Sequence, residues 1–448
     1  MAPHVRPMPG AVVAVVLGVV VALAVSTALP TGRAQAAAGP AWGVVASSCT
    51  AASVAANRAV GLTVVEVEAY WDRYMPARAG AVDAGYVADL RARVTRCLDA
   101  GLRVVLGPGM QYPPAWVRAL PGAALVDQRG RTAATGALDT VFSAAVRSAQ
   151  ADYLKRLLTD LPAARIEAVR LGTSTEGEIG YPGPNAAHDG FLQSWWAFSP
   201  AAQQGTGLAA GAVRTPMPGW VPGQRTWQGR PVTAAAARAW FGWYSRSLTS
   251  AIKGQYDALR AARFTGQVHL PAPGRGVLPA DLTAAANALL NGTGDRDGSL
   301  GRGLDYVDQF PVLARSVPRL VVDLSGVDDA SAVLARRQSP AQDACRSTDP
   351  AASVAAGTPV HLWSNLRFAR AQATRAGLPA VGENPGPPAA QTGGTPDSDT
   401  LAEQVRRAPG YARSCGLSAL LVAFEWALDD PRWGVTRDDY RRAVLGGP

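Results

Sequence analysis

Short apolar runs rich in β-branched residues alternate with helix-like stretches along this chain, and that alternation limits the possible folds more than any other feature. The first runs are residues 42–47, 62–70 and 102–109, and the stretch before the third has helical spacing up to Gly101. Strands with helices between them pair in parallel through right-handed crossovers. Further predicted strands cover residues 166–172, 266–274, 304–310, 378–386 and 418–427, with another extended piece at 319–326.

Eight such units predict an α/β fold, a (β/α)8 TIM barrel. The connection after the fourth strand is long and holds a tryptophan- and proline-rich part before a long helix, so we expect a loop insertion at about residues 173–233. A bare barrel needs about 250 residues, and the 448 residues here leave room for large loops. The alternative is an open doubly wound sheet, but no glycine-rich phosphate loop follows the first strand.

The N-terminus has the layout of a secretory signal peptide. Arg6 gives a basic start, residues 11–25 are almost wholly apolar, and Ala-Gln-Ala at 34–36 offers a cleavage site. We therefore expect a signal peptide at 1–36, a single barrel at 37–448, and a secreted product without stable membrane association. The alternative is an uncleaved N-terminal anchor, which usually needs about 20 apolar residues.

Four cysteines in an exported chain indicate two disulfides, for which three pairings are possible. We expect Cys49–Cys97 and Cys345–Cys415, because each pair lies within one half of the chain. The alternative, four buried free thiols, fits export less well. The cysteine spacing matches no zinc motif, and we expect neither a metal nor another cofactor.

The net charge of +9 is carried almost entirely by arginine, since Lys155 and Lys253 are the only lysines. The arginines are spread along the whole chain and form no basic run interleaved with aromatic residues. We therefore expect no nucleic-acid partner.

Carboxylates follow two of the predicted strands in turns rich in glycine and proline. Glu176 and Glu178 lie in RLGTSTEGEIGYPGP after the fourth strand, and Glu383 lies in GENPGP after the seventh. The active site of a TIM barrel lies at the C-terminal ends of its strands, and the fourth and seventh strands stand on opposite sides. Two facing carboxylates suit cleavage of a glycosidic bond, because one can stay protonated for the leaving oxygen while the other attacks the sugar or activates water.

Aromatic and polar side chains near the other strand ends predict a sugar-binding cleft, because pyranose rings pack their apolar faces on flat aromatic rings. A simpler interpretation stays open for each of them, since a loop glutamate is usually a solvated charge and clustered tryptophans often pack in a core. The candidate substrate-binding residues are Glu68, Trp71, Tyr112, Trp116, Tyr181, Trp195, Trp196, Asp308, Asn384, Glu425 and Trp426.

The two carboxylate turns resemble those of known glycoside hydrolases. GEIGYP is similar to the Gly-Glu-Leu-Arg-Tyr-Pro segment of the β-amylases, glycoside hydrolase family fourteen, and GENPGP is similar to their Gly-Glu-Asn-Ala-Leu-Pro segment. This resemblance implies Glu178 as the acid and Glu383 as the base, with Glu176 ranked second because that family has a small residue there. Residues 64–117 also resemble the β-galactosidases of family forty-two in the order of their segments: a strand, an acidic and aromatic segment, a helix, a second strand and then Pro-Pro-Ala-Trp. Both families are (β/α)8 barrels.

The sequence therefore predicts an exported glycoside hydrolase that acts on an oligo- or polysaccharide, with Glu178 as acid and Glu383 as base or nucleophile. The alternative is a secreted carbohydrate-binding barrel that has lost catalysis. Both would use the aromatic side chains, and only the enzyme needs the two carboxylates.

Overall fold

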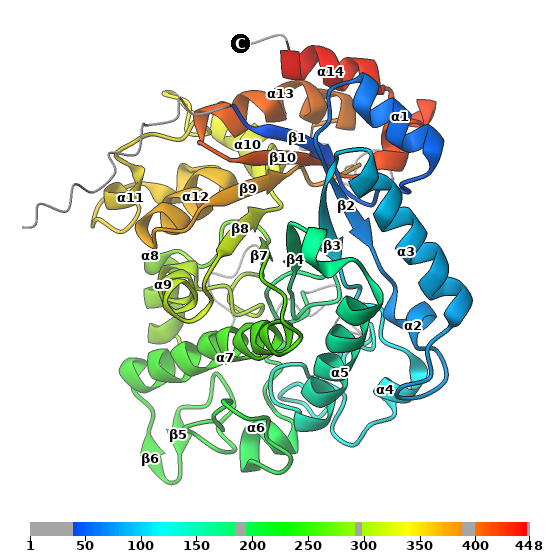
Figure 1. Cartoon of the computed structure of the whole chain (residues 1–448). Coiled ribbons are helices and arrows are strands. Elements are labelled where there is room, and N and C mark those ends of the chain that lie inside the picture. Colours follow the sequence, from blue (N-terminus) through cyan, green and yellow to red (C-terminus); the bar gives the residue numbers. More distant parts are fainter. Residues whose placement is uncertain (1–38, 184–193, 292–297, 388–398, 446–448) are drawn as a thin grey trace, which may run out of the picture. The chain divides into compact units, whose positions relative to one another are not determined.

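The computed structural model describes residues 39–183, 194–291, 298–387 and 399–445 (Figure 1). The predicted signal peptide, residues 1–36, lies outside these ranges. Across the described ranges, no helix has both the length and the apolar character needed to cross a membrane.

Parallel strands in the described chain close into one barrel. Each strand pairs with its neighbour in the order β1, β2, β3, β4, β7, β8, β9 and β10, and β10 pairs back to β1. This closure confirms the predicted (β/α)8 fold and excludes an open sheet. The barrel strands are β1 (Ala41–Val44), β2 (Val64–Glu68), β3 (Arg103–Gly107), β4 (Ala168–Arg170), β7 (Gln267–Ala272), β8 (Leu320–Leu324), β9 (Ala380–Glu383) and β10 (Ala419–Val422).

Side chains inside the barrel form an apolar layer with a charged layer above it, toward the C-terminal ends of the strands. The apolar layer takes one residue or more from each of β2, β3, β4, β8, β9 and β10. Successive side chains of a strand alternate between its faces, so the next inward position lies two residues further on. On five of these strands that position holds Glu66, Gly107, Arg170, Asp323 and Glu383.

The helices around the barrel begin at polar caps that the sequence supplies. Ser143, Thr233, Asp305 and Ser364 each accept a hydrogen bond from the backbone N–H three residues ahead, which satisfies a donor that the first helical turn leaves free. Figure 1 shows these helices packed around the strands. The longer helices are α1 (Ala51–Ala59), α3 (Ala84–Asp99), α5 (Ala144–Asp160), α7 (Ala234–Ala261), α8 (Pro279–Asn287), α9 (Tyr306–Ser316), α12 (Asn365–Arg375), α13 (Leu401–Ser414) and α14 (Arg437–Leu445).

Residues 304–310 do not form the sixth strand, so this prediction was wrong. They lead into α9, which begins after its cap Asp305 and buries Tyr306, Phe310 and Leu313 at helical spacing. The sixth barrel strand is β8, which lies within the additional extended piece at 319–326. A short apolar run is compatible with a buried strand and with the buried face of a helix, and periodicity alone does not separate them.

The tryptophans in the described part of the insertion pack against α7, and none of residues 194–233 lines the cavity at the strand ends. Trp195 and Trp220 each meet Trp240 of α7 edge-on at 5.5 Å, and the indole N–H of Trp196 donates to the carbonyl oxygen of Pro182. All of these tryptophans are buried. The prediction that Trp195 and Trp196 bind substrate is therefore wrong, because these large apolar rings gain more from burial against a helix than from lining a wet loop. The insertion also contains α6 (Pro200–Gln204) and the hairpin β5–β6 (Thr226–Trp227, Arg230–Pro231), drawn beside α7 in Figure 1.

Both predicted disulfides are present. Cys49 pairs with Cys97 and ties the segment before α1 to α3, with 5.7 Å between their Cα atoms. Cys345 pairs with Cys415 and ties the loop before α12 to the end of α13, with a Cα separation of 5.0 Å. Each bond therefore links neighbouring parts of the outer layer.

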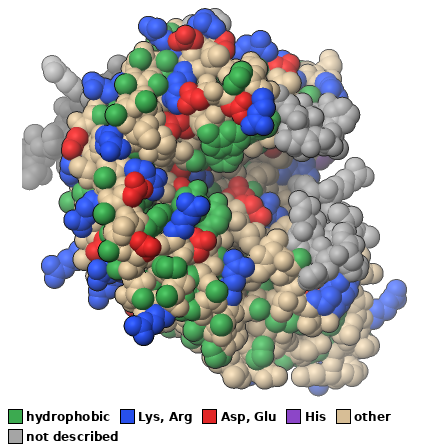
Figure 2. All heavy atoms as spheres, turned by 90° about the vertical axis from the view of Figure 1, so that its right-hand side faces the viewer, with side chains coloured by type: hydrophobic (Ala, Val, Ile, Leu, Met, Phe, Trp, Pro, Cys, Tyr) green, Lys and Arg blue, Asp and Glu red, His purple; other side chains and the backbone are tan. Residues whose placement is uncertain are grey.

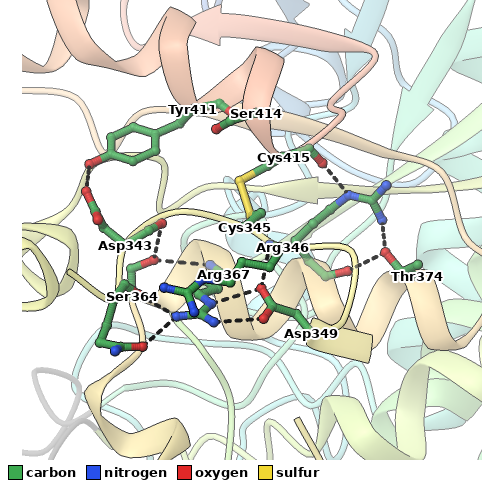
Figure 3. Close-up of a disulfide and its surroundings, with 12 residues drawn as sticks. Asp343, Cys345, Arg346, Asp349, Ser364, Arg367, Thr374, Tyr411, Ser414 and Cys415 are labelled. Carbon is green, nitrogen blue, oxygen red and sulfur yellow. Dashed lines mark hydrogen bonds and ion pairs between the residues drawn. A yellow bond between two sulfur atoms is a disulfide. The ribbon is translucent and has the colours of Figure 1, made fainter. Parts of the chain in front are cut away.

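The second disulfide lies within a polar network that holds the same loop (Figure 3). The guanidinium of Arg367 pairs with the carboxylate of Asp349 at 2.8 Å, and both side chains are almost fully buried. The hydroxyl of Tyr411 donates to Asp343 at 2.6 Å. These contacts fasten the loop to α12 and α13 independently of the covalent bond.

Removal of the first disulfide should destabilise the protein more than the same change at the second. Cys49→Ser with Cys97→Ser opens a loop of 48 residues, for which chain entropy predicts a loss of up to about 4 kcal/mol. Cys345→Ser with Cys415→Ser should cost less, because the polar network still holds that loop. Denaturant unfolding under non-reducing conditions measures both, and an unchanged midpoint in the first variant would contradict this expectation.

Candidate active site

A cavity of about 450 Å³ lies at the C-terminal ends of the barrel strands. It is lined from β2, β4 and β9 and from the loops that follow β3, β4 and β10. Figure 2 shows a hollow in one face of the molecule, with acidic side chains inside it and hydrophobic side chains along its edge. The predicted site residues that line the cavity are Glu68, Tyr112, Glu176, Glu383 and Trp426.

Arg170 is the central charge of this cavity. Its Nη2 lies 2.9 Å from Glu383 Oε2 and 3.6 Å from Asp323 Oδ2, so one guanidinium joins the carboxyl groups of β8 and β9. Burial alone lowers the pKa of Arg170, but the surrounding carboxyl groups, Glu383 first, more than offset this and raise it. The guanidinium is therefore a permanent positive charge inside the barrel.

Glu383 closes β9 and is the predicted base. Its side chain is almost buried, and burial raises its pKa to about 8. The positive charge of Arg170 acts in the opposite direction, while the negative charges of Asp323 and Glu178 raise the pKa further. A small change in its surroundings can therefore shift this carboxyl group between its two protonation states near neutral pH.

Glu178 is held in the turn after β4. Its backbone N–H donates to Ser174 Oγ, and the turn from Ser174 to Gly177 lines the cavity. Its carboxylate accepts hydrogen bonds from Ser325 Oγ at 2.6 Å and from Arg302 Nη2 at 3.1 Å. The influence of its charge on the pKa of Glu383 places it in the same electrostatic cluster.

Glu176, the second candidate for the acid, has a different environment from Glu178. It is exposed, and one of its oxygens accepts a hydrogen bond from the hydroxyl of the neighbouring Thr175. The two candidates therefore differ in burial and in partners, since Glu178 is partly buried and contacts Ser325 and Arg302.

Two carboxyl groups of β2 share the space above Gly107 of β3. A Cβ atom at position 107 would overlap both Glu66 Oε1 and Glu68 Oε2, so the absent side chain leaves room for them. Glu66 is fully buried, and its Oε2 accepts a hydrogen bond from the backbone N–H of Ala46 at 2.8 Å. Glu68 reaches the cavity and accepts a hydrogen bond from Gln111 Nε2 at 2.7 Å.

Two aromatic pairs border the cavity. Tyr70 and Tyr112 come from the loops after β2 and β3, with 4.9 Å between their ring centroids. Phe424 and Trp426 follow β10 and stack with a centroid distance of 5.6 Å. Tyr112 and Trp426 are 39% and 46% exposed, so their ring faces are accessible to a ligand.

Three other predicted aromatic contacts are core residues. Trp71 is fully buried and stacks on Tyr153, and Trp116 meets Trp71 edge-on while its indole N–H donates to the carbonyl oxygen of Met75. Tyr181 is buried and stacks on Tyr244 at 4.1 Å. The prediction that Trp71 and Tyr181 bind substrate is wrong, because their rings are buried, and the half-buried Trp116 packs against the core and does not line the cavity.

Asp308, which we predict from sequence as a substrate contact, is not in the cavity. It lies in the first turn of α9 and pairs with Arg246 of α7 at 2.6 Å. The error follows from the assignment of residues 304–310 as a strand. As a strand these residues would end at the cavity, whereas as a helix start they lie on the outer layer.

Glu425 and Asn384 hold the frame of the site and do not line the cavity. Glu425 accepts hydrogen bonds from the hydroxyls of Ser47 and Ser53 and from the amide of Asn57, so it ties the end of β10 to the start of the barrel. Asn384 follows Glu383 directly. Its amide donates to Gln404, and its carbonyl oxygen accepts from the backbone N–H of Ala423. The prediction of direct substrate contact is wrong for both, because their polar atoms are already engaged.

Arg170 and Asp323 are the site residues that the sequence predictions miss. Each is a single charged residue within an otherwise apolar strand, in "AVRLG" and "LVVDLS". Charged residues are almost never fully buried unless they are paired, so a lone charge at an inward position of such a strand indicates an ion pair inside the barrel. That signal is useful only where it is known which residues of a strand point inward, and the sequence predicts residues 319–326 only as an additional extended piece.

His269 of β7 lies next to this charged layer but does not line the cavity. Burial and the charge of Arg170 lower its pKa to about 3, so the imidazole is neutral. Its Nε2 has no hydrogen-bond partner among the described residues. Over the same part of the chain, no group of three or more His, Cys, Asp and Glu side chains is placed to hold a metal ion.

No known family model and no curated protein matches this sequence. The fold is similar to the catalytic domain of beta-amylase from Paenibacillus polymyxa, with a TM-score of 0.59 and 12% identity over 91% of this chain and 99% of that chain. It is also similar to beta-galactosidase from the psychrophilic Marinomonas ef1, with a TM-score of 0.54 and 12% identity over 91% of this chain and 58% of that one. These similarities confirm the (β/α)8 barrel, and at such identity they establish the fold alone.

Gly107→Ala should destabilise the protein by about 1–3 kcal/mol, which is the usual cost of overpacking a filled interior. The new methyl group would overlap the carboxyl oxygens of Glu66 and Glu68, and both would have to move. Denaturant unfolding measures the change.

The matched control for this variant is Gly410→Ala on α13. A Cβ there meets nothing within 4 Å, so the change should be neutral or should stabilise the helix by about 0.5–1 kcal/mol. Equal stability of the two variants would contradict the described position of the β2 carboxyl groups.

Proposed function

We propose that this protein is an exported glycoside hydrolase whose reacting carboxyl groups are Glu178 and Glu383. The observation that carries the proposal is a cavity at the C-terminal end of a (β/α)8 barrel that Glu383 lines, while Glu178 follows directly on the turn that lines the cavity and its charge raises the pKa of Glu383. The loop motifs around both residues resemble those of the β-amylases. The beta-amylase catalytic domain with a similar fold supports the same class.

Glu178 is the proposed proton donor to the leaving oxygen, and Glu383 is the proposed base or nucleophile. Glu383 acts in its ionised form, which Arg170 favours through the contact at 2.9 Å. Five carboxyl groups, from Glu66, Glu68, Glu178, Asp323 and Glu383, lie around the guanidinium groups of Arg170 and Arg302 in the described part of the chain. Burial and neighbouring negative charges raise the pKa values of Glu68, Asp323 and Glu383, so these groups hold protons more readily than free carboxyl groups do. The proposed chemistry needs one protonated and one ionised carboxyl group.

The proposed substrate is a neutral oligo- or polysaccharide. The surplus of carboxyl groups repels uronic acids and other anionic sugars, which lose favourable hydration without gaining a counter-charge. The exposed faces of Tyr112 and Trp426 offer two apolar surfaces for sugar rings along the cavity. A substrate that uses both surfaces spans more than one sugar unit.

Export is part of the proposal. The predicted signal peptide at residues 1–36 supports it, and two disulfides are typical of chains that fold outside the reducing cytosol. N-terminal sequencing of the secreted product should place the new end just after Ala36. A mature chain that still carries residues 11–25 would favour the anchored alternative.

Glu178→Gln and Glu383→Gln should each lower the rate of hydrolysis by about 10²–10⁴-fold, because an amide neither donates a proton to a leaving group nor activates water. The stability of both variants should stay close to wild type, since the amide keeps the shape of the side chain. The assay is reducing-end release from a panel of neutral and uronic oligosaccharides, in which we expect turnover of neutral members only.

Glu167→Gln is the matched control, because Glu167 lies just before β4, at the opposite end of the strand, and pairs with Arg103. Its rate should equal that of wild type. Glu176→Gln separates the two candidates for the acid, and a greater loss there than in Glu178→Gln would move that role to Glu176. If the wild type binds a sugar of the panel but releases no reducing ends, the protein is the non-catalytic carbohydrate-binding barrel.

The pH dependence of kcat/KM should report the role of Glu383. Its pKa is raised to about 8, and only the ionised form can act as base or nucleophile, so kcat/KM should rise as the pH approaches 8 from below. A profile of kcat/KM from pH 5 to 10 in the wild type measures this limb. A fall of kcat/KM over the same range would reverse the two roles and make Glu383 the acid.

A further inference from the structure

Glu66 and Glu68 form a carboxyl pair that the proposed acid–base chemistry does not use. Both point to the same face of β2, since they are two positions apart along the strand. Both carboxyl groups reach the point above Gly107 where a side chain would otherwise lie. A glycine at this one position therefore lets two acidic groups approach each other inside the barrel.

The atoms that meet above Gly107 are Glu66 Oε1 and Glu68 Oε2. Glu66 Oε1 is buried and has no hydrogen-bond donor among the described residues, whereas Oε2 of the same group is satisfied by the N–H of Ala46. Two facing carboxylate oxygens, one of them buried without a donor from the described residues, are unfavourable through repulsion and through the lost hydrogen bond. A single proton between the two oxygens removes both costs.

The groups around the pair favour one negative charge on it. Arg170 faces the pair from β4, and Gln111 donates to the other oxygen of Glu68. Asp323 and Glu383 add negative charge from β8 and β9, and the phenols of Tyr70 and Tyr112 lie on the cavity side. Burial raises the pKa of Glu68 well above its ordinary value, and the charge and hydrogen bond of Glu66 raise it further against Arg170 and Gln111.

We propose that Glu66 and Glu68 share one proton above Gly107 and act as a single group with one negative charge, in which Glu66 is the positioning residue for Glu68. The proton stays between Glu66 Oε1 and Glu68 Oε2. The other oxygen of Glu68, Oε1, remains an acceptor at the cavity. The shared negative charge balances the positive charge of Arg170. A change in the charge of the pair therefore changes the electrostatic potential at Glu383.

The proton itself can be tested without any activity. A native protein that holds a proton which the unfolded chain has released becomes less stable as the pH rises. Glu66→Gln replaces the shared proton by an amide N–H that does not titrate. Above pH 4.5, the ordinary pKa of glutamate, the unfolding equilibrium constant of wild type relative to Glu66→Gln should therefore rise by up to about tenfold per pH unit. Denaturant unfolding of the full chain from pH 4 to 9 measures this ratio.

Two further variants make the result decisive. Glu68→Gln places the amide on the other member of the pair and should give the same trend, which covers the case in which Glu66→Gln does not fold. Glu167→Gln removes a carboxyl group outside the cavity and should stay parallel to wild type. Parallel curves for Glu66→Gln or Glu68→Gln would overturn the shared proton. In wild type labelled with ¹³C at the glutamate carboxyl groups, two resonances should titrate together above pH 4.5, and their absence would also overturn it.

The influence of the pair on the reaction rests on the proposed function and has its own readout. The negative charge of the pair contributes to the raised pKa of Glu383, so the double variant Glu66→Gln with Glu68→Gln, which removes this charge altogether, should shift the limb of kcat/KM near pH 8 to lower pH. Glu167→Gln should leave this limb in place. If the stability ratio changes with pH while this limb does not move, the pair shares a proton but does not position the reacting groups. If no sugar is hydrolysed, the stability ratio still decides the shared proton.

Discussion

The guanidinium of Arg170 is the charge on which the whole upper layer of the barrel depends. It is buried at the end of β4 and contacts Glu383 and Asp323, while Glu66 and Glu68 lie within range of its field. A buried carboxylate without a counter-charge would protonate or destabilise the fold. One fixed positive charge allows several carboxyl groups to remain close together, with enough residual repulsion to hold protons among them.

The geometry of the barrel brings Arg170 and these carboxyl groups together in one layer. Parallel strands with a common register bring every second residue to the same height, so an apolar layer is followed by a charged layer two residues later. The apolar layer closes the barrel below the charges, so these groups are buried on that side. Desolvation then raises the pKa values of Glu68 and Glu383, which means that the apolar residues contribute to the chemistry of the site as directly as its polar ones.

Much of this could be predicted from the sequence, because strand periodicity, helix caps and cysteine spacing are local signals. The barrel, both disulfides and the place of Glu383 at a strand end follow from them. The errors concern packing, which local patterns do not encode. Trp195 packs on a helix that lies more than forty residues further along the chain, and residues 304–310 become helical because Asp305 caps them. To recognise Arg170 as a site residue from the sequence, one must know which residues of the other strands point inward, because its carboxyl partners lie on those strands.

A barrel fold supports many activities, so the function of this chain has to be argued from its charged layer. Two proteins with 12% identity share its fold, and that identity leaves the site residues free to differ. What sets the chemistry here is the balance between burial, which favours the neutral carboxylic acid, and Arg170, which favours the carboxylate. Glu383 experiences both effects at once. In the proposed enzyme, a sugar in the cavity would displace water and increase burial, so substrate binding would itself shift the protons of this cluster, and the order of binding and ionisation would become part of the mechanism.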